Sequence, residues 1–242
     1  MNKSTYFYYP VVAYVMLLLC VWLLSWVMGV VALLTGDVTS LFSLVSAEGL
    51  RWAVRSASMM LDDVPWAAIM FFVTSIGLLV GSGMVRSARA VFRGSSLSYV
   101  EHRAWLSAAL AFVIYITLLF ICTIYPWDFL LGVTGGFYAS PLLQGRMFLF
   151  FVGVLFVAVV YGFIYGNYRT VADVARSVGN AFSLYAPAIV ALLPAAGIIP
   201  CAERVGLLSL LGVTEQGAAV FSYIMYLVPF MYIMLLLRQS TK

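Results

Sequence analysis

Long apolar runs separated by short polar segments dominate the chain. A helix needs about 20 apolar residues to cross the hydrocarbon core of a bilayer. Each long run free of charged residues therefore predicts one membrane span. Six runs meet this condition: 11–34, 64–84, 104–124, 147–165, 181–201 and 218–237. The first run is too long for a signal peptide and no small-residue cleavage site follows it, so we expect it to be retained as a span.

Polar residues at the ends of these runs indicate where helices begin. Ser98 and Glu101 have the S-x-x-E spacing of a capping box before the third span. Thr170 and Asp173 have a similar spacing before the fifth. Residues 85–103 are interpreted as an arginine-rich loop.

Two further segments differ from ordinary loops. Residues 46–61 have the spacing of an amphipathic helix, with an apolar face and a polar face: Leu50, Val54, Ala57 and Leu61 against Arg51, Arg55 and Ser58. This helix is either an arm or lid on the non-cytoplasmic side or an interfacial helix between two spans, and we expect the second. The aromatic and glycine-rich segment 125–145 is either re-entrant or an aromatic anchor at the interface, and anchoring is the simpler interpretation.

Composition makes the class of protein clear. Of the 242 residues, 64% are apolar and 9% are charged, and the mean hydropathy is +1.07. Soluble domains are near half apolar and a quarter charged. These values exclude a soluble enzyme, a nucleic-acid-binding domain, a disulfide scaffold and a disordered chain. We therefore predict an all-α integral membrane protein that forms a single membrane domain over residues 1–242, with six transmembrane helices and an interfacial amphipathic helix after the first.

The distribution of basic residues predicts the orientation. The net charge is +4. With six spans, nine Lys and Arg fall on the side of the termini: Lys3, Arg86, Arg89, Arg93, Arg103, Arg169, Arg176, Arg238 and Lys242. Four fall on the other side: Arg51, Arg55, Arg146 and Arg204. Because short cytoplasmic segments carry the excess of basic residues, we expect a multi-pass protein of the inner (plasma) membrane with both termini in the cytoplasm.

The sequence offers no constellation of catalytic groups. His102 is the only histidine, and the three cysteines Cys20, Cys122 and Cys201 are widely spaced in or beside apolar runs. We therefore predict no catalytic residue, no metal site and no cofactor, and do not expect an enzyme. No charged residue lies inside any of the six runs, although ionisable residues at membrane depth ordinarily mark the path of an ion or substrate.

One span nevertheless has a feature that could bind a substrate. The fifth run contains Pro187, Pro194 and Pro200. Each proline removes a helix hydrogen bond and can free a carbonyl group. Two outcomes are open, an unwound segment that binds a ligand or a kinked helix satisfied by its neighbours, and the second is the more common. We take Asn180, Ser183, Pro187 and Pro194 as the candidate substrate-binding residues.

Two pairs of glycines favour close helix packing. Gly77 with Gly81, and Gly162 with Gly166, have the small-xxx-small spacing of helices that approach closely, within one bundle or across an oligomer interface. Packing within the chain is the simpler expectation.

Several segments resemble one known family. They are SLVSAEGLRWAVRS at 43–56, LSYVEHRAWLSAAL at 97–110, SPLLQG at 140–145 and VVYGFIYGNYRTVADVARSV at 159–178. In their order and content they are similar to the p-aminobenzoyl-glutamate transporter (AbgT) family. The YG-x-x-x-G pattern followed by an Asp-Val pair is the most specific of these segments.

The resemblance also has departures. Family members are longer, and a region with a re-entrant hairpin looks deleted between the second span and residue 97. The chain stops where the second hairpin would be expected, so a shortened member lacking both hairpin regions is implied. In the family the hairpins form the substrate and cation site, so no site residue is carried over.

Two functions from different classes are therefore expected. The first is an AbgT-like transporter of small organic anions such as aminobenzoyl-glutamate-type folate fragments. The alternative is a non-transporting scaffold or subunit that has lost the transport core and binds a partner membrane protein in the bilayer. The expected partners are the lipid bilayer and a second copy of the chain or a partner membrane protein, with no nucleic acid.

Overall fold

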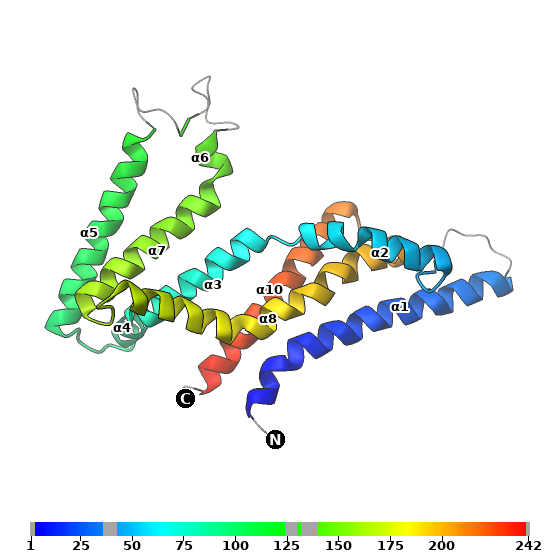
Figure 1. Cartoon of the computed structure of the whole chain (residues 1–242), viewed down its shortest axis with the longest axis horizontal. Helices are drawn as coiled ribbons and strands as arrows, with labels where there is room; N and C mark the ends of the chain where they lie inside the picture. Colours follow the sequence, from blue (N-terminus) through cyan, green and yellow to red (C-terminus); the bar gives the residue numbers. More distant parts are fainter. Residues whose placement is uncertain (1–2, 36–42, 124–129, 132–139, 241–242) are drawn as a thin grey trace. The chain divides into compact units, whose positions relative to one another are not determined.

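The structure is a computed structural model that describes residues 3–35, 43–123, 130–131 and 140–240. All regular elements in this part of the chain are helices (Figure 1). They are η1 (Lys3–Tyr8), α1 (Tyr9–Thr35), α2 (Ala47–Asp62), α3 (Trp66–Gly81), α4 (Met84–Phe92), α5 (Tyr99–Ile121), α6 (Pro141–Gln144), α7 (Arg146–Tyr165), α8 (Val171–Val205), α9 (Leu207–Leu210) and α10 (Glu215–Ser240). The predicted all-helical fold is confirmed.

Five helices are long and apolar enough to cross a membrane, and a sixth span is obtained if α2 and α3 form one bent pair. The five are residues 6–31, 99–121, 146–165, 171–205 and 216–237. The predicted second span, 64–84, is helical only over α3. It ends early because Ser82 leaves the helix and Gly83 has a left-handed backbone with φ of 86°.

Two segments predicted as loops are largely helical. Residues 85–103 contain α4 and the first turn of α5. The segment before the fifth span contains the start of α8, which begins ten residues earlier than the predicted span. Most of the segment 125–145 lies outside the described residues, so neither interpretation of it is tested. Its last part contains α6, where Ser140 Oγ accepts the Leu143 N–H at 3.3 Å.

The chain divides into two compact units, each described by itself. Unit 1 contains Met1–Pro65 and Tyr185–Lys242. Within it, Tyr185 on α8 stacks on Phe230 of α10 with ring centroids 5.9 Å apart. The Arg204 guanidinium lies 5.6 Å from the centroid of the Trp52 ring, in the range of a cation–π contact.

The predicted amphipathic helix is confirmed as α2 in unit 1. Ser46 is its N-cap, and its hydroxyl accepts the Gly49 N–H at 3.0 Å. Gly49 and Met60 are buried, whereas Val54 in the apolar stripe is 80% exposed. The stripe is therefore available to lipid, as in helices that lie in the membrane interface.

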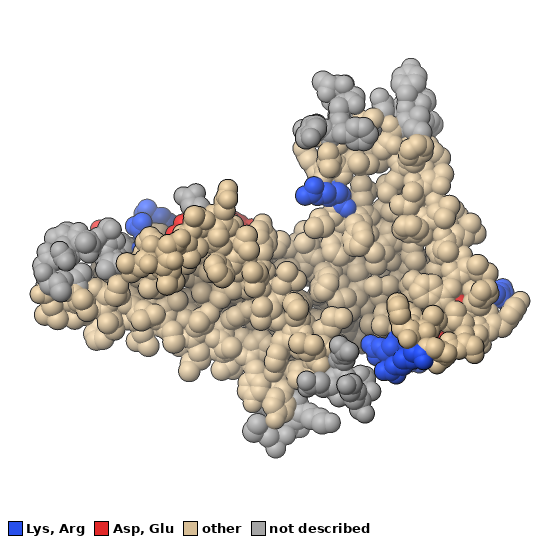
Figure 2. Space-filling view, turned by 180° about the vertical axis from the view of Figure 1, so that it is seen from behind, with Lys and Arg blue, Asp and Glu red and all other residues tan. Residues whose placement is uncertain are grey.

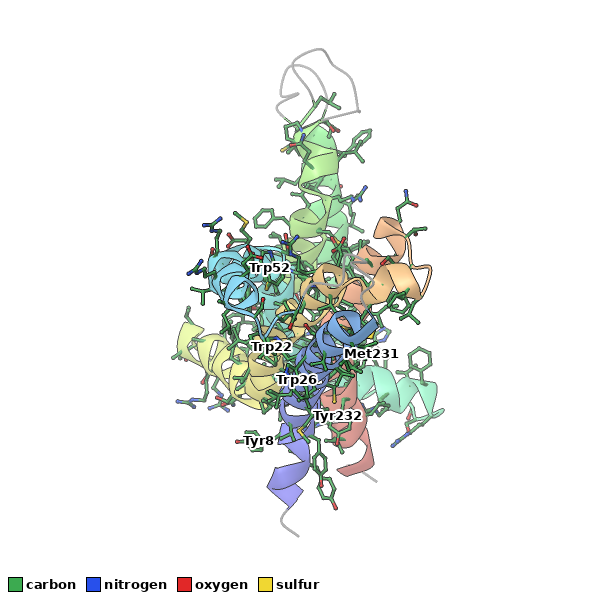
Figure 3. All side chains as sticks on the ribbon, turned by 90° about the vertical axis from the view of Figure 1, so that its right-hand side faces the viewer. Tyr8, Trp22, Trp26, Trp52, Met231 and Tyr232 are labelled. Atoms are coloured by element: carbon green, nitrogen blue, oxygen red, sulfur yellow. The ribbon has the colours of Figure 1, made fainter. Side chains whose placement is uncertain are left out.

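The outer surface of the helices is apolar. Figure 2 shows lysine and arginine side chains gathered in a few small patches on an otherwise largely uncharged face. Figure 3 shows aromatic and methionine side chains on the outside of unit 1, including Tyr8, Trp26 and Met231, each more than half exposed. A water-soluble protein rarely exposes such large apolar patches, so this surface is suited to contact with lipid.

Unit 2 contains Trp66–Leu184. Helix α7 packs against both α3 and α5. Small residues permit the close approaches. A Cβ at Gly77 would lie 2.8 Å from the Cβ of Ala181, and one at Gly153 would lie 2.7 Å from the Tyr115 ring. The first glycine pair therefore packs within the chain. Gly166 does not pack against a helix, because it ends α7 with φ of 90°.

Candidate functional site

A hydrogen-bonded group of side chains lies in unit 2 where α3 ends and α4 begins. We call this group the polar junction. It consists of Ser82, Ser87, Trp105, Tyr161, Asn167 and Tyr168, which come from the α3–α4 break, α4, α5, α7 and the α7–α8 turn. Both Ser82 and Ser87 are fully buried, as is Tyr161.

The first part of the polar junction closes the C-terminal end of α3. The Asn167 side-chain amide donates hydrogen bonds to the carbonyl oxygens of Gly81 at 3.3 Å and Ser82 at 2.9 Å. The Tyr168 hydroxyl donates to the Leu78 carbonyl at 3.0 Å. The last carbonyls of a helix lack helical donors, and here the Asn167 amide supplies donors to Gly81 and Ser82. The Leu78 carbonyl also accepts the Ser82 N–H at 2.8 Å, so the Tyr168 hydroxyl is its second donor. This helix break is therefore held by the protein's own donors.

The second part fixes the orientation of α4. The Ser87 hydroxyl lies 2.7 Å from the Tyr161 hydroxyl, and the Trp105 Nε1–H donates to Ser87 Oγ at 3.1 Å. Ser87 Oγ also donates to the Met84 carbonyl at 3.1 Å. A buried polar network in which each member has a partner is rigid and specifies one arrangement. It holds one side of α4 against α5 and α7.

The segment 161–173, which carries the most specific part of the family resemblance, builds much of this junction. A Cβ on Gly162 would overlap the Tyr168 ring, so glycine is required for the ring to pack there. The Asp173 carboxylate accepts the N–H groups of Arg169 and Thr170, each at 3.0 Å, which confirms the predicted cap of α8. The motif is therefore accounted for by packing and capping.

The four predicted substrate-binding residues all lie on α8. Asn180 and Ser183 are exposed, Pro187 is buried and Pro194 is half-buried. The helix is continuous over Val171–Val205 despite its three internal prolines, so the unwound segment that we considered is not present. The Asn180 side chain has no hydrogen-bond partner among the described residues.

A proline-freed carbonyl was missed by sequence reasoning. Pro229 lies inside α10 and is fully buried. It has no N–H to donate to the carbonyl of Met225, four residues earlier. The hydroxyl of Tyr14 on α1 donates to that carbonyl at 2.7 Å instead. The proline was visible in the sequence, but its partner is 211 residues away along the chain.

Metal-ligating side chains do not gather in the described part of the chain. No group of three or more His, Cys, Asp or Glu there could hold an ion. One buried hydroxyl, Ser75 Oγ on α3, has no hydrogen-bond partner among the described residues.

Comparison with known families identifies the family to which the chain belongs. The sequence model of the AbgT putative transporter family matches residues 81–239 of the 242. The chain belongs to this family. The match begins at Gly81, so it covers the polar junction, α5, α7, α8 and nearly all of α10. The segment 43–56 lies outside it. No curated protein and no solved structure matches the chain. The AbgT family consists of transporters rather than enzymes.

Proposed function

We propose that this AbgT chain moves small organic anions across the inner (plasma) membrane, with aminobenzoyl-glutamate-type folate fragments as the substrate class. Membership of a transporter family carries the proposal. The five to six helices able to cross a bilayer support it, because transport requires a membrane-spanning path.

We place the substrate contact on α8. Asn180 and Ser183 are three residues apart on this helix, a spacing that places side chains next to each other, and Pro187 and Pro194 follow along the same helix. Pro187 lacks the N–H that would otherwise bond the Ser183 carbonyl. The Asn180 amide supplies two N–H donors and the Ser183 hydroxyl a third. Such donors can bind a carboxylate without a charged side chain in the membrane.

Uptake into liposomes tests this assignment. The purified chain is reconstituted alone and with any co-purifying protein, and the initial uptake of labelled aminobenzoyl-glutamate is measured. We expect N180A/S183A to lower this rate at least fivefold. S222A is the matched control, because its hydroxyl only bonds the Ala218 carbonyl of its own helix at 3.1 Å. Absence of uptake in both preparations, for folate fragments and other organic anions, would refute transport. An unchanged rate in N180A/S183A would remove α8 from the path.

One observation favours a second candidate, a non-transporting scaffold or subunit that binds a partner membrane protein. No charged residue lies in the six apolar runs, and coupled carriers ordinarily need a carboxylate or an unwound segment near the midplane. Residues 84–98 contain only α4 and a short connection, which supports a shortened core that lacks the first hairpin region. A stoichiometric membrane partner, together with no uptake in either preparation, would favour this candidate.

We further propose that both termini face the cytoplasm and that the chain forms one membrane domain in a homo-oligomer. The excess of basic residues in the terminal and 85–103 segments supports the orientation. In a cysteine-free background, S95C should react with an impermeant maleimide in inside-out vesicles, and S209C in right-side-out vesicles. The reverse pattern would invert the topology. Chemical cross-linking in liposomes tests the homo-oligomer, because the size of the cross-linked product gives the number of copies of the chain.

A further inference from the structure

Three arginines form a stripe along one side of α4. Arg86, Arg89 and Arg93 are spaced by three and four residues, the spacing that places side chains next to each other on a helix. All three are exposed. Ser87 lies on another side of the helix, where the polar junction holds it. Since that network fixes the rotation of α4, the arginine stripe has a fixed outward direction.

The nearby acidic side chains of unit 2 are engaged elsewhere. The Glu101 carboxylate accepts the Ser98 N–H at 2.8 Å, and the Asp173 carboxylate caps the start of α8. Within the described residues, no carboxylate lies within salt-bridge distance of the three arginines. Their positive charge is therefore not neutralised within unit 2.

An apolar side chain adjoins the stripe. Phe92 lies between Arg89 and Arg93 in the sequence and is 91% exposed. Helix α4 lies at the end of unit 2 where α3 and α7 finish and α5 begins (Figure 1). In a membrane-spanning chain, the ends of apolar helices are expected near the lipid headgroups. Two left-handed glycines, Gly83 and Gly94, bound this short helix.

We propose that α4 is a binding site for the headgroups of anionic phospholipids. Guanidinium groups bind phosphate oxygens through paired hydrogen bonds. Basic residues beside a membrane span are attracted to anionic lipid, and an exposed aromatic ring suits the boundary between headgroups and acyl chains. The stripe supplies three such groups in one row, with Phe92 beside it. The site prefers lipids whose headgroups are negatively charged. This preference does not depend on which substrate the chain transports.

Lipid-dependent thermal stabilisation of the full chain in detergent tests the proposal. The protein is titrated with dioleoyl-phosphatidylglycerol or dioleoyl-phosphatidylcholine, and the lipid concentration at half-maximal stabilisation is measured. Each arginine near an anionic surface raises the affinity for that surface about fivefold. Salt screens part of this attraction. We expect phosphatidylglycerol to act at a concentration at least tenfold lower than phosphatidylcholine.

Variants identify the residues responsible. R86Q/R89Q/R93Q should reduce the preference for phosphatidylglycerol to within twofold, and R86K/R89K/R93K should keep most of it because the charge remains. R51Q/R55Q on α2 is the matched control and should leave the preference unchanged, since both of those arginines are also exposed. If the glutamine variant fails to fold, 0.5 M salt on the unmodified chain replaces it and should remove the preference.

Four results would overturn the proposal. These are no preference in the unmodified chain, a preference that survives R86Q/R89Q/R93Q or high salt, an equal loss in R51Q/R55Q, and equal stabilisation by inorganic phosphate alone. The last result would identify a site for a free anion instead of a lipid headgroup.

Discussion

The hydrogen bond between Tyr14 and the Met225 carbonyl gives the sharpest prediction for stability. Pro229 removes the helix donor of that carbonyl, and Tyr14 is largely buried. Leaving a buried acceptor without a partner costs about 1–3 kcal/mol. Hydrogen bonds between helices in membrane proteins average about 0.6 and reach about 1.7 kcal/mol. Because this acceptor has no second donor in its own helix, we expect Y14F to cost about 1.5 kcal/mol.

A double-mutant cycle isolates the cause. P229A restores an N–H that can bond the Met225 carbonyl within α10. In that background, Y14F should cost only about 0.5 kcal/mol, which gives a coupling energy of about 1 kcal/mol. The free energy of unfolding would be measured by titrating the detergent-solubilised chain with dodecyl sulfate and following circular dichroism.

Y115F is the matched control for this cycle. The Tyr115 hydroxyl donates to the Leu149 carbonyl at 2.6 Å. Four residues later stands Gly153, whose N–H already bonds this carbonyl within α7. Y115F should therefore cost about 0.5 kcal/mol. If Y14F costs the same with and without P229A, or no more than Y115F, the proline-freed carbonyl is not what Tyr14 stabilises and the reasoning fails.

The remaining predictions concern α8 and the polar junction. G162A should destabilise the chain by about 1–3 kcal/mol through overlap with the Tyr168 ring, whereas G179A, with open space around its Cβ, should be neutral or stabilising by up to about 1 kcal/mol; equal effects in the same unfolding titration would contradict this. N167A should cost about 1–3 kcal/mol because two carbonyls at the end of α3 lose their donor, and an unchanged unfolding midpoint would show that water replaces the amide. N180A/S183A should lower uptake at least fivefold with little change in stability, because both side chains are exposed; a matching loss of stability would instead indicate a structural role.

Sequence pattern was sufficient for the elements whose cause is local. A charge-free run identifies a span because each residue independently avoids water, and the caps at Ser98 and Asp173 depend on neighbours within four residues. The amphipathic period of α2 is also local. These features were predicted correctly for that reason.

Features that depend on distant partners were missed. Helix α4 was interpreted as a loop because its segment is rich in charged residues. The three- and four-residue spacing of its arginines was nevertheless a signal for a helix. The end of α3 is set by Ser82 and Gly83. The carbonyls of Gly81 and Ser82 accept hydrogen bonds from Asn167 on the α7–α8 turn, and a Cβ at Gly83 would lie 2.7 Å from the Asn167 amide nitrogen. The candidate residues on α8 were proposed from proline chemistry alone, and the continuous helix shows that three prolines do not by themselves unwind it.

Helix α8, like α1, is long compared with the thickness of a bilayer. Its charge-free part, residues 177–202, is about 39 Å long at 1.5 Å per residue, against about 30 Å of hydrocarbon. A helix with this positive mismatch must tilt, bend or locally thicken the membrane. The prolines in its second half weaken the backbone where bending would relieve the mismatch. The stability of the chain should therefore rise in bilayers of longer acyl chains, and the angle of α8 should change with the membrane that surrounds it.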